Sequence, residues 1–558
     1  MASASESKPW LKNYPEGVAH EIDISKYKNI MSVFDEAVRT HKNGASFSNM
    51  GVTLSFQDLD QKVGQFASFL QNELKLKKGD RIAIQMPNLL QFPVVLFGAL
   101  RAGLIVVNTN PLYTAKEMRH QFKDSGAKAI VILANFASLL QEVIKDTDIQ
   151  SVVVTEIGDL LPFPKSLLVN SVVKHVKKMV PAYTLPQAYT FKKALDIGSA
   201  RPYTDVAVSY EDTAFLQYTG GTTGVSKGAV LTHKNILSNM SQIVIWMRPL
   251  LRSGEEVIIT ALPLYHIFSL TVNCLAFMTY GGHNILITNP RDISAFIKTL
   301  RTTPFTVMTG VNTLYNALMN HPDFGKISFK NVKLSVAGAM ALQRVVAEKW
   351  KQLTGTSIFE GYGLTETSPA VCVNPIKGGK DMVGTIGMPL PSTMVKLVDD
   401  DGKEVAQGQE GELCVKGPQV MNGYYNRPDE TAKVMLDKDW LKTGDVAVML
   451  ENGFFKIVDR KKDMILVSGF NVYPNEVEDA IASHPGVLEV AAVGVTDTHS
   501  GEIVKAFVVK RDPALTEADV IAHARKSLTN YKVPKLVEFR TELPKTNVGK
   551  ILRRALRA

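Results

Sequence analysis

Short apolar runs alternate along the chain with segments whose apolar residues recur at helical spacing. In the first third, apolar runs occupy residues 81–86, 104–109 and 128–133, and helical segments occupy 90–102 and 116–126. The same rhythm returns at residues 257–262, 283–288, 305–310 and 334–339. Alternating strands and helices predict a mostly parallel sheet covered by helices. We therefore expect an α/β fold whose large N-terminal domain contains two similar lobes.

The pattern changes after about residue 380 to short strands separated by turn signals. Asn452-Gly453 lies between two apolar segments and is typical of a hairpin turn, so we expect a small β-barrel-like unit here. The charged segment 459–463 then marks a domain boundary. The tail predicts a small α+β domain, with a helix at 474–483, strands at 487–495 and 502–509, a helix at 516–528 and a strand at 535–540. The predicted domains are residues 1–459 and 460–558, the second being mobile about the boundary.

Residues 257–290 contain no Asp, Glu, Lys or Arg, and this length could suit a membrane-spanning helix. Pro263, Gly281 and Gly282 interrupt the run, as do several polar residues. A buried strand, helix and strand of an α/β core fit this pattern better.

Composition and cysteine content narrow the class of protein. The 558 residues are 45% hydrophobic and 21% charged, near the averages for globular domains, which excludes collagen, coiled-coil and disordered chains. The three cysteines form no Cys-x-x-Cys pair, so neither a disulfide framework nor a cysteine zinc site is expected. The first residues have no apolar core of a secretory signal, and we expect a cytoplasmic protein.

The net charge of +9 is concentrated in two segments. Residues 162–193 hold six lysines and no acid, and residues 532–558 hold eight basic residues against two acidic ones. The remainder of the chain is slightly acidic, which argues against a nucleic-acid partner.

Residues 218–228, YTGGTTGVSKG, form a loop rich in glycine and hydroxyl groups that ends in a lysine. Glycines let backbone N–H groups approach an anion, and Lys227 adds positive charge, so the loop predicts phosphate binding. It is not a Walker loop, because Ser226 precedes the lysine and the following residues read as a strand. It also contains G-x-S-x-G, but a hydrolase elbow needs a strand-to-helix turn.

Three further motifs follow: GYGLTETSP at 361–369, WLKTGD at 440–445 with DRKKD at 459–463, and PKTNVGK at 544–550. Each alone could be a turn or a solvated charge cluster. In this order they resemble the adenylate-forming (AMP-binding) superfamily of acyl-CoA synthetases and luciferases, across about residues 30–555. The tail, with DRKKDMILVSGFNVYPNEVED and NYKVPKLVEF, is similar to the bacterial long-chain fatty-acid–CoA ligases.

The resemblance implies an enzyme that uses ATP and Mg²⁺ to convert a fatty acid to acyl-AMP and pyrophosphate, and then transfers the acyl group to coenzyme A. It implies that Lys550, Glu366 and Thr365 act in catalysis and that Glu366 and Thr219 hold Mg²⁺. The nucleotide and CoA sites implied by the resemblance comprise Tyr218, Thr219, Gly220, Gly221, Thr222, Thr223, Gly224, Lys227, Gly338, Ala339, Tyr362, Gly363, Asp445, Arg460, Lys462 and Gly469. Within this set, Asp445 matches the residue that binds the ribose hydroxyls.

The family's two steps imply two orientations of the small domain. Lys550 matches the lysine that bridges the carboxylate and α-phosphate during adenylation only. Lys462 matches the hinge, and Gly469 matches the glycine that borders the pantetheine tunnel after rotation. Val548 stands where many members carry serine, a departure that leaves the assignment of Lys550 intact.

The resemblance places the acyl pocket between segments 307–314 and 338–340, with His266, Val311 and Gly338 beside the substrate. These segments are small and apolar, which suits a long chain without fixing its length. For His266 a structural role in the core is an equal alternative. A ligase for medium-chain or aromatic acids, or an acyl-AMP ligase that loads a carrier protein, are alternative functions.

Residues 168–180, wound as a helix, place seven apolar residues on one face and three lysines opposite. The apolar residues are Leu168, Val169, Val172, Val173, Val176, Met179 and Val180, and the lysines are Lys174, Lys177 and Lys178. This pattern is typical of a helix that lies on an anionic membrane surface. It predicts peripheral association with the cytoplasmic face of the inner membrane, although packing against the protein itself is the alternative. The oligomeric state stays open, a homodimer included.

Overall fold

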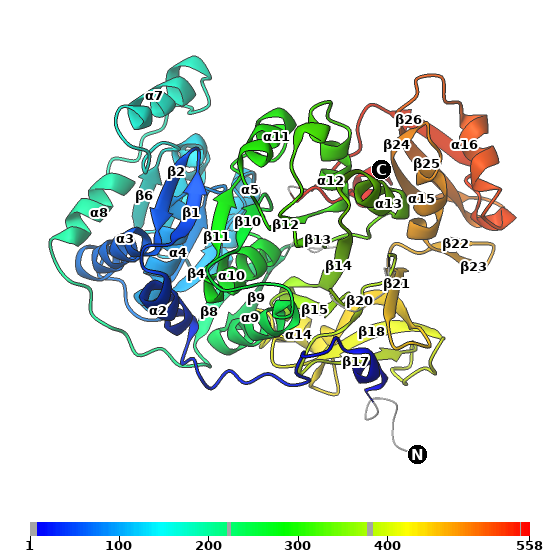
Figure 1. Cartoon of the computed structure of the whole chain (residues 1–558), viewed down its shortest axis with the longest axis horizontal. Coiled ribbons are helices and arrows are strands. Elements are labelled where there is room, and N and C mark those ends of the chain that lie inside the picture. The colour runs from blue at the N-terminus through cyan, green and yellow to red at the C-terminus, as the bar shows by residue number, and fades with distance from the viewer. Residues whose placement is uncertain (1–7, 220–224, 377–382, 547, 558) are drawn as a thin grey trace.

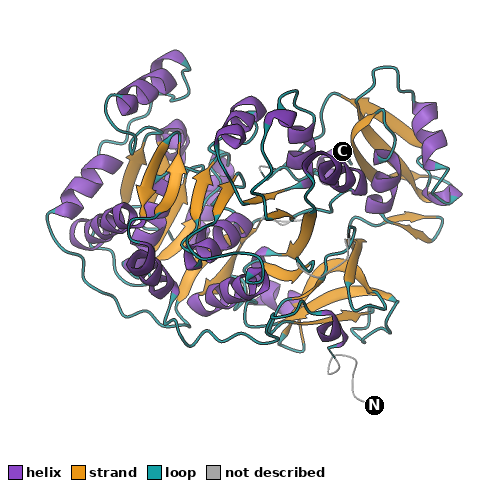
Figure 2. Ribbon diagram, viewed as in Figure 1, coloured by secondary structure: helices purple, strands orange, loops and turns teal. Residues whose placement is uncertain are grey.

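The computed structural model describes residues 8–219, 225–376, 383–546 and 548–557. Figure 1 shows two α/β sheets in the large domain, a β-rich unit beside them and a separate C-terminal domain at the far end. Figure 2 shows helices on both faces of the two large sheets. This is the predicted α/β architecture.

The first sheet has seven strands in the order β7-β6-β5-β3-β4-β8-β9. Its strands are β3 (Arg81–Gln85), β4 (Ile105–Asn108), β5 (Ala129–Leu133), β6 (Ser151–Thr155), β7 (Tyr189–Thr190), β8 (Thr213–Thr219) and β9 (Lys227–Thr232). Neighbours pair in parallel except β8 and β9, which form an antiparallel hairpin. Nearby helices are α3 (Phe56–Ser68), α4 (Gln91–Arg101), α5 (Ala115–Ser125), α6 (Ala137–Val143) and α8 (Phe191–Ser199).

The second sheet has nine strands in the order β16-β15-β14-β13-β12-β10-β11-β1-β2. Its strands are β1 (Ala45–Asn49), β2 (Val52–Ser55), β10 (Val257–Thr260), β11 (His283–Leu286), β12 (Val307–Gly310), β13 (Leu334–Ala337), β14 (Ile358–Gly363), β15 (Ala370–Val373) and β16 (Met388–Pro389). Associated helices are α2 (Ile30–His41), α9 (His233–Met247), η6 (Ser269–Ala276), α10 (Phe277–Thr279), α11 (Ile293–Thr302), α12 (Asn312–Met319) and α13 (Arg344–Thr354). The charge-free run thus supplies β10, η6, α10 and β11 of a buried core, as predicted.

Local sequence signals set several of these boundaries. Thr114 and Glu117 form a capping box at the start of α5, and Gly126 ends that helix with a positive φ of 59°. Thr232, the last residue of β9, caps α9 in the same way with Asn235. The chain therefore passes from the β8–β9 hairpin directly into a helix.

The β-rich unit is a five-stranded antiparallel sheet in which β21 pairs with β20. Its elements are β17 (Met394–Val398), β18 (Glu410–Lys416), α14 (Pro428–Val434), β19 (Met435–Leu436), β20 (Trp440–Met449) and β21 (Phe455–Arg460). The predicted Asn452-Gly453 turn joins β20 to β21, and the φ of Gly453 is +77°.

The C-terminal domain contains every predicted element and also a short hairpin, β22–β23. Its elements are β22 (Ile465–Val467), β23 (Phe470–Val472), α15 (Pro474–Ala482), β24 (Val487–Asp497), β25 (Gly501–Lys510), α16 (Glu517–Ala524), β26 (Leu536–Arg540) and the 3₁₀ turn η10 (Arg553–Leu556). Lys550 lies between β26 and η10. The chain leaves the β-rich sheet at Arg460 and enters the C-terminal sheet at Ile465.

Helix α12 of the large domain contacts the C-terminal domain directly. The Thr313 hydroxyl donates to the Gly549 carbonyl at 2.9 Å, and Asn316 Nδ2 donates to the Leu488 carbonyl at 3.1 Å. These bonds join the two domains in the orientation of this structure.

Helix α7 (Lys165–Ser171), continued by η5 (Val172–Val176), projects from the first lobe. The predicted helix is thus present but ends before Met179. Part of its apolar face is exposed, with relative accessibilities of 62% for Leu168 and 73% for Val176, whereas Val169, Val173 and Val180 are half-buried. In the part of the chain that the structure describes, no helix has the length and apolar character needed to cross a bilayer.

Candidate active site

The β8–β9 hairpin carries the candidate phosphate loop. Tyr218 and Thr219 end β8 and Lys227 begins β9, with Thr219 paired to Lys227 across the stem. The predicted residues Gly220, Gly221, Thr222, Thr223 and Gly224 lie outside the described residues. The Tyr218 hydroxyl donates to Asp124 at 2.7 Å, and burial with this bond raises the pKa of Tyr218. The stem is therefore anchored to α5.

Lys227 is held by a segment that sequence reasoning missed, residues 422–430. The Lys227 Nζ lies 2.6 Å from Glu430 Oε2 and 4.7 Å from the centre of the Tyr424 ring. The pairing with Lys227 and Lys433 lowers the pKa of Glu430 to about 2. An incoming phosphate would compete with Glu430 for the same ammonium group.

Glu366 and Thr365 lie in the 3₁₀ turn η8 (Thr365–Thr367), which follows β14. The Tyr424 hydroxyl donates to Glu366 Oε1 at 2.7 Å. Tyr424 thus contacts both Glu366 and, through its ring, Lys227. The segment containing it extends the hairpin, because Tyr425 N donates to the Gly228 carbonyl at 2.8 Å. A tyrosine pair after a glycine is the only sequence signal that could have indicated this role.

A second group joins β14 to the β20–β21 hairpin. The Tyr362 hydroxyl donates to Asp445 Oδ2 at 2.6 Å, and Arg460 Nε lies 3.4 Å from Asp445 Oδ1. Asp445 is 5% exposed, and these two partners replace the contacts with water that its carboxylate lacks. Burial raises the pKa of Tyr362, and the neighbouring Asp445 adds to the effect. Gly363, the last residue of β14, leads from this group to η8.

Gly338 and Ala339 follow β13 and lie next to this group. A Cβ on Gly338 would come within 2.9 Å of the Phe268 ring and 3.1 Å of the Gly361 carbonyl, so only glycine fits. Ala339 has a φ of +66°, which is uncommon for a residue with a side chain. Val311, which precedes α12, is buried. The structure therefore brings the predicted adenine and acyl segments together.

Lys550 enters this cluster from the C-terminal domain. Its pKa falls to about 8, because burial disfavours the ammonium and Arg460 lies nearby, while Asp445 opposes the shift. His266 shares the environment: burial, and then the charge of Lys550, lower its pKa to about 4. His266 is consequently neutral at pH 7 and lies within electrostatic reach of Lys550.

Lys462 lies near the cluster, whereas Gly469 lies in a turn of the C-terminal domain. Lys462 is exposed in the chain between β21 and β22, where burial of its surroundings and the charge of Arg460 lower its pKa. Gly469 is exposed in the β22–β23 turn with a φ of +83°. The charges of Arg460 and Asp445 both act on Lys462, so in this orientation it lies within electrostatic reach of the candidate site.

The donor set suits Mg²⁺ shared with a nucleotide. The described residues contain no group of three or more His, Cys, Asp or Glu that could hold a metal alone. Magnesium in nucleotide enzymes is usually held by one or two carboxylates together with substrate phosphates. Glu366 supplies one carboxylate beside the β8–β9 hairpin, in which Thr219 is the last residue of β8. This arrangement fits a magnesium ion shared with substrate phosphates.

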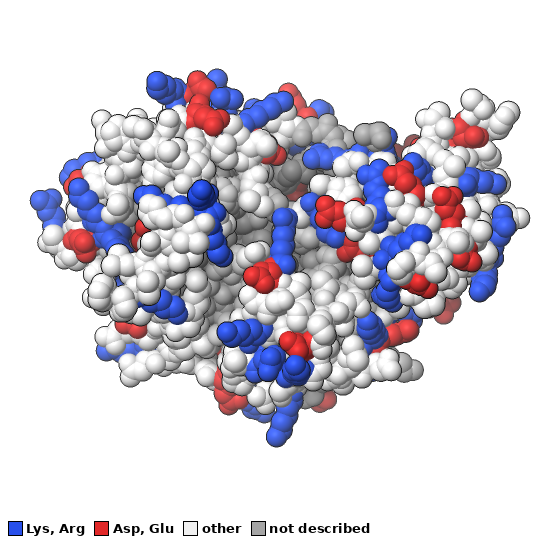
Figure 3. All heavy atoms as spheres, turned by 90° about the horizontal axis from the view of Figure 1, so that it is seen from above, with Lys and Arg blue, Asp and Glu red and all other residues white. Residues whose placement is uncertain are grey.

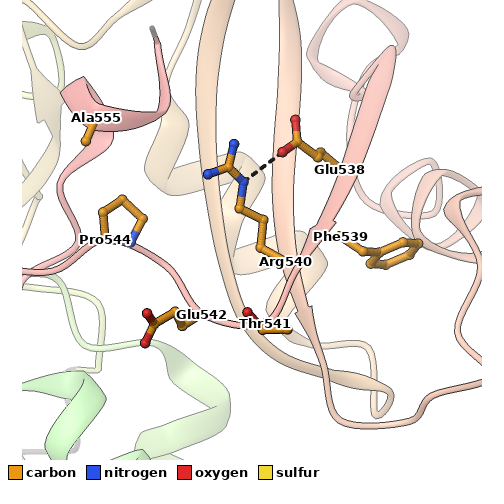
Figure 4. Close-up of a pocket in the computed structure, with 7 residues that line it drawn as sticks. All are labelled: Glu538, Phe539, Arg540, Thr541, Glu542, Pro544 and Ala555. Carbon is orange, nitrogen blue, oxygen red and sulfur yellow. Dashed lines mark hydrogen bonds and ion pairs between the residues drawn. The ribbon is translucent and has the colours of Figure 1, made fainter.

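An open hollow of about 540 Å³ on the C-terminal domain is separate from this cluster (Figure 4). It lies between β26 and the following chain, lined among others by Arg540, Glu542 and Pro544. An ion pair of 2.7 Å joins Arg540 to Glu538 at its edge. None of the candidate site residues lines it.

The chain belongs to the AMP-binding enzyme family. The family model for the AMP-binding enzyme matches residues 34–425, and that for the AMP-binding enzyme C-terminal domain matches residues 476–550. The long-chain-fatty-acid–CoA ligase of Escherichia coli O157:H7 is 56% identical over 550 residues, covering 99% of this chain and 98% of that protein. The enzyme of the same name from Haemophilus influenzae is 53% identical over 552 residues, with the same two coverages.

The fold matches that of an anthranilate CoA ligase solved in complex with anthranoyl-AMP, with a TM-score of 0.84 over 96% of this chain and 98% of that one. The two sequences are 24% identical, so this likeness concerns the fold.

Proposed function

We propose that this protein is an AMP-forming long-chain-fatty-acid–CoA ligase. The observation that carries the proposal is the position of Lys550, which reaches from the C-terminal domain into the environment of His266, Arg460 and Asp445. The full-length similarity to ligases of that name supports a long-chain fatty acid as the substrate.

In the first step, a carboxylate oxygen of the fatty acid attacks the α-phosphorus of ATP. The bond from this phosphorus to the bridging oxygen breaks, and pyrophosphate leaves with the electron pair. Lys550 neutralises charge on the carboxylate and α-phosphate, with Thr365 beside the same phosphate. Preorganised cations and N–H groups are the main way proteins stabilise such a transition state. Lys227 breaks its ion pair with Glu430 and binds the β- and γ-phosphates instead.

Asp445 binds the ribose hydroxyls, since Tyr362 and Arg460 hold its carboxylate in place. Gly338 and Ala339 line the adenine, and His266, neutral at pH 7, hydrogen-bonds the acyl carboxylate beside Val311. Mg²⁺ held by Glu366, Thr219 and phosphate oxygens would neutralise charge on the departing pyrophosphate.

In the second step, the CoA thiolate attacks the acyl carbon of acyl-AMP, the bond to the phosphate oxygen breaks, and AMP leaves. Lys550 occupies the space that CoA needs, so the C-terminal domain, residues 460–558, rotates about Lys462. Gly469 then borders the pantetheine tunnel.

The test is pyrophosphate release from Mg·ATP with acetate, octanoate, palmitate or benzoate, each with and without CoA. We expect palmitate to drive release and CoA to be required for sustained turnover. Sustained release with benzoate but not palmitate would transfer the assignment to aromatic acids. Palmitate-driven release that CoA does not sustain would indicate an acyl-AMP ligase for a carrier protein.

The low pKa of Lys550 predicts an alkaline loss of adenylation. With its pKa near 8 in the free protein, the ammonium is present at pH 7 and disappears as the pH rises through 8. The rate of pyrophosphate release at subsaturating ATP, measured without CoA, should therefore fall above about pH 8, because it reports ionisations of the free enzyme. At saturating ATP the decline should move to higher pH, since bound anions favour the ammonium.

Lys550→Arg is the control, because a guanidinium stays charged throughout this range. The variant should lose the alkaline decline whatever its absolute rate. If the rate of pyrophosphate release still fell above about pH 8 in Lys550→Arg, the decline would belong to another titrating group.

We also propose that α7 and η5 bind an anionic membrane surface. Exposed apolar side chains gather on this projection, namely Phe163, Leu167, Leu168, Val172, Val176 and Met179. Lys174, Lys177 and Lys178 lie beside them, with no acidic residue between 162 and 193. Figure 3, a view from above, shows basic side chains around a largely uncharged surface at this end of the molecule. This arrangement suits peripheral binding at the cytoplasmic face of the inner membrane.

Replacing Val172, Val176 and Met179 with glutamine should lower binding to anionic vesicles by at least about tenfold, because three exposed apolar side chains lose their burial in lipid. Sedimentation with vesicles measures binding, and turnover of octanoate in free solution should be unchanged. The matched control replaces the exposed apolar residues Val345 and Leu353 of α13. Equal binding by the two variants would contradict the proposal.

A further inference from the structure

Arg553, three residues after Lys550, makes the densest set of polar contacts in the C-terminal segment. Its Nε and Nη2 lie 2.9 and 2.7 Å from the two carboxylate oxygens of Glu478, and its Nη2 lies 2.5 Å from Asn475 Oδ1. Its Nη1 lies 3.0 Å from Asp459 Oδ1 and 3.7 Å from Asp463 Oδ2. The guanidinium is thus engaged on every side.

These partners belong to different parts of the molecule. Glu478 and Asn475 lie on α15 of the C-terminal domain, whereas Asp459 lies in β21 of the β-rich sheet. Asp459 is 1% exposed and accepts a second bond that crosses from one part to the other, from Asn475 N at 2.8 Å. Asp463 belongs to the connecting chain. Arg553 therefore bonds both within its own domain and across to the large domain.

The segment between Lys550 and Arg553 is held in a fixed shape. Thr546 N donates to the Lys550 carbonyl at 2.7 Å, and Leu552 N donates to the Pro544 carbonyl at 2.8 Å. Lys545 is paired with Glu489 of β24 at 2.7 Å. Because this turn is closed by its own hydrogen bonds, the position of Arg553 determines the position of Lys550.

We propose that Arg553 is a positioning residue that holds the C-terminal domain in the orientation where Lys550 reaches the site, and that Asp459 is its cross-domain partner. The inference deepens the proposed function and rests on its two orientations. A rotation about residues 460–463 separates Arg553 from Asp459 but carries Glu478 and Asn475 along. The guanidinium keeps its three bonds to Glu478 and Asn475 in either orientation and loses its bond to Asp459 on rotation. The bond from Asn475 N to Asp459 and the two bonds from α12 are lost in the same rotation.

The test compares two carboxylates that bind the same arginine. Asp459→Asn should lower the rate of palmitoyl-AMP formation by about tenfold or more, since it weakens a charged hydrogen bond present in one orientation only. Formation of palmitoyl-CoA from supplied palmitoyl-AMP should be unchanged. Glu478→Gln is the matched control: it weakens bonds within the C-terminal domain that both orientations retain, so it should not favour one orientation over the other. Arg553→Lys, which retains the charge but not the planar fork, should behave as Asp459→Asn does.

A cross-linking measurement separates this proposal from the proposed function. Cysteines at Asn316 and Leu488, joined by a short bis-maleimide, report the domain contact without any catalysis, and the three natural cysteines are buried. Asp459→Asn should lower the cross-linking yield and Glu478→Gln should not. Equal loss of both half-reactions in Asp459→Asn, or an unchanged yield, would overturn the role of Arg553. Absence of palmitoyl-AMP in the unmodified protein would instead overturn the proposed function, leaving the cross-linking test valid.

Discussion

Lys550→Ala is expected to lower acyl-AMP formation by on the order of 100- to 1000-fold, the usual effect of removing one preorganised group that stabilises transition-state charge. The formation of palmitoyl-CoA from supplied palmitoyl-AMP should change little. The reason is geometric. In the orientation seen here Lys550 lies near Arg460, Asp445 and His266. In the proposed second step the C-terminal domain has rotated and Lys550 no longer lies in the active site. Pyrophosphate release and thioester formation are measured separately.

Lys545→Ala is the matched control for this experiment. Lys545 lies in the same segment but is bound to Glu489 within the C-terminal domain. Its replacement should affect both half-reactions alike. If Lys550→Ala depressed both half-reactions equally, Lys550 would be a structural residue and not a group that acts in one step.

The periodicity of the sequence predicted the two lobes and the tail, because buried parallel strands and amphipathic helices have distinct patterns that repeat over many residues. The loop between β8 and β9 was recognisable for a different reason, its density of glycine and hydroxyl residues before Lys227. The hairpin β22–β23 was missed, since strands of three residues are too short to show a period.

The sequence motifs supplied a list of candidate site residues but not the contacts among them. The order of the motifs placed Lys550 and Asp445 in one list. Only the fold shows that Arg460 forms an ion pair with Asp445 and that the charge of Lys550 lowers the pKa of His266. Tyr424 was missed because residues 422–430 have the composition of a polar loop. Their role depends on pairing with β9, a contact between segments about 200 positions apart in sequence that no local pattern encodes.

Gly469→Leu is expected to slow thioester formation by on the order of 100-fold, comparable to other misplacements of a reacting group, while acyl-AMP formation changes little. In the present orientation a Cβ on Gly469 has no heavy atom within 4 Å, and the residue is exposed in the β22–β23 turn. The Cβ of a side chain there therefore has open space around it in the orientation of the adenylation step. A large effect on the second step alone therefore requires a different orientation, in which this turn faces the site.

Backbone strain must be separated from this steric effect. The φ of Gly469 is +83°, so any side chain there costs roughly 1–2 kcal/mol in backbone conformation. Gly469→Ala carries the same strain with a small side chain, and Gly501→Leu places a leucine at a φ of +75° in the paired strand β25. If the tunnel is the cause, thioester formation should fall far more in Gly469→Leu than in either control. Equal losses in the three variants would assign the effect to strain, and the proposed rotation would then lose its support from this turn.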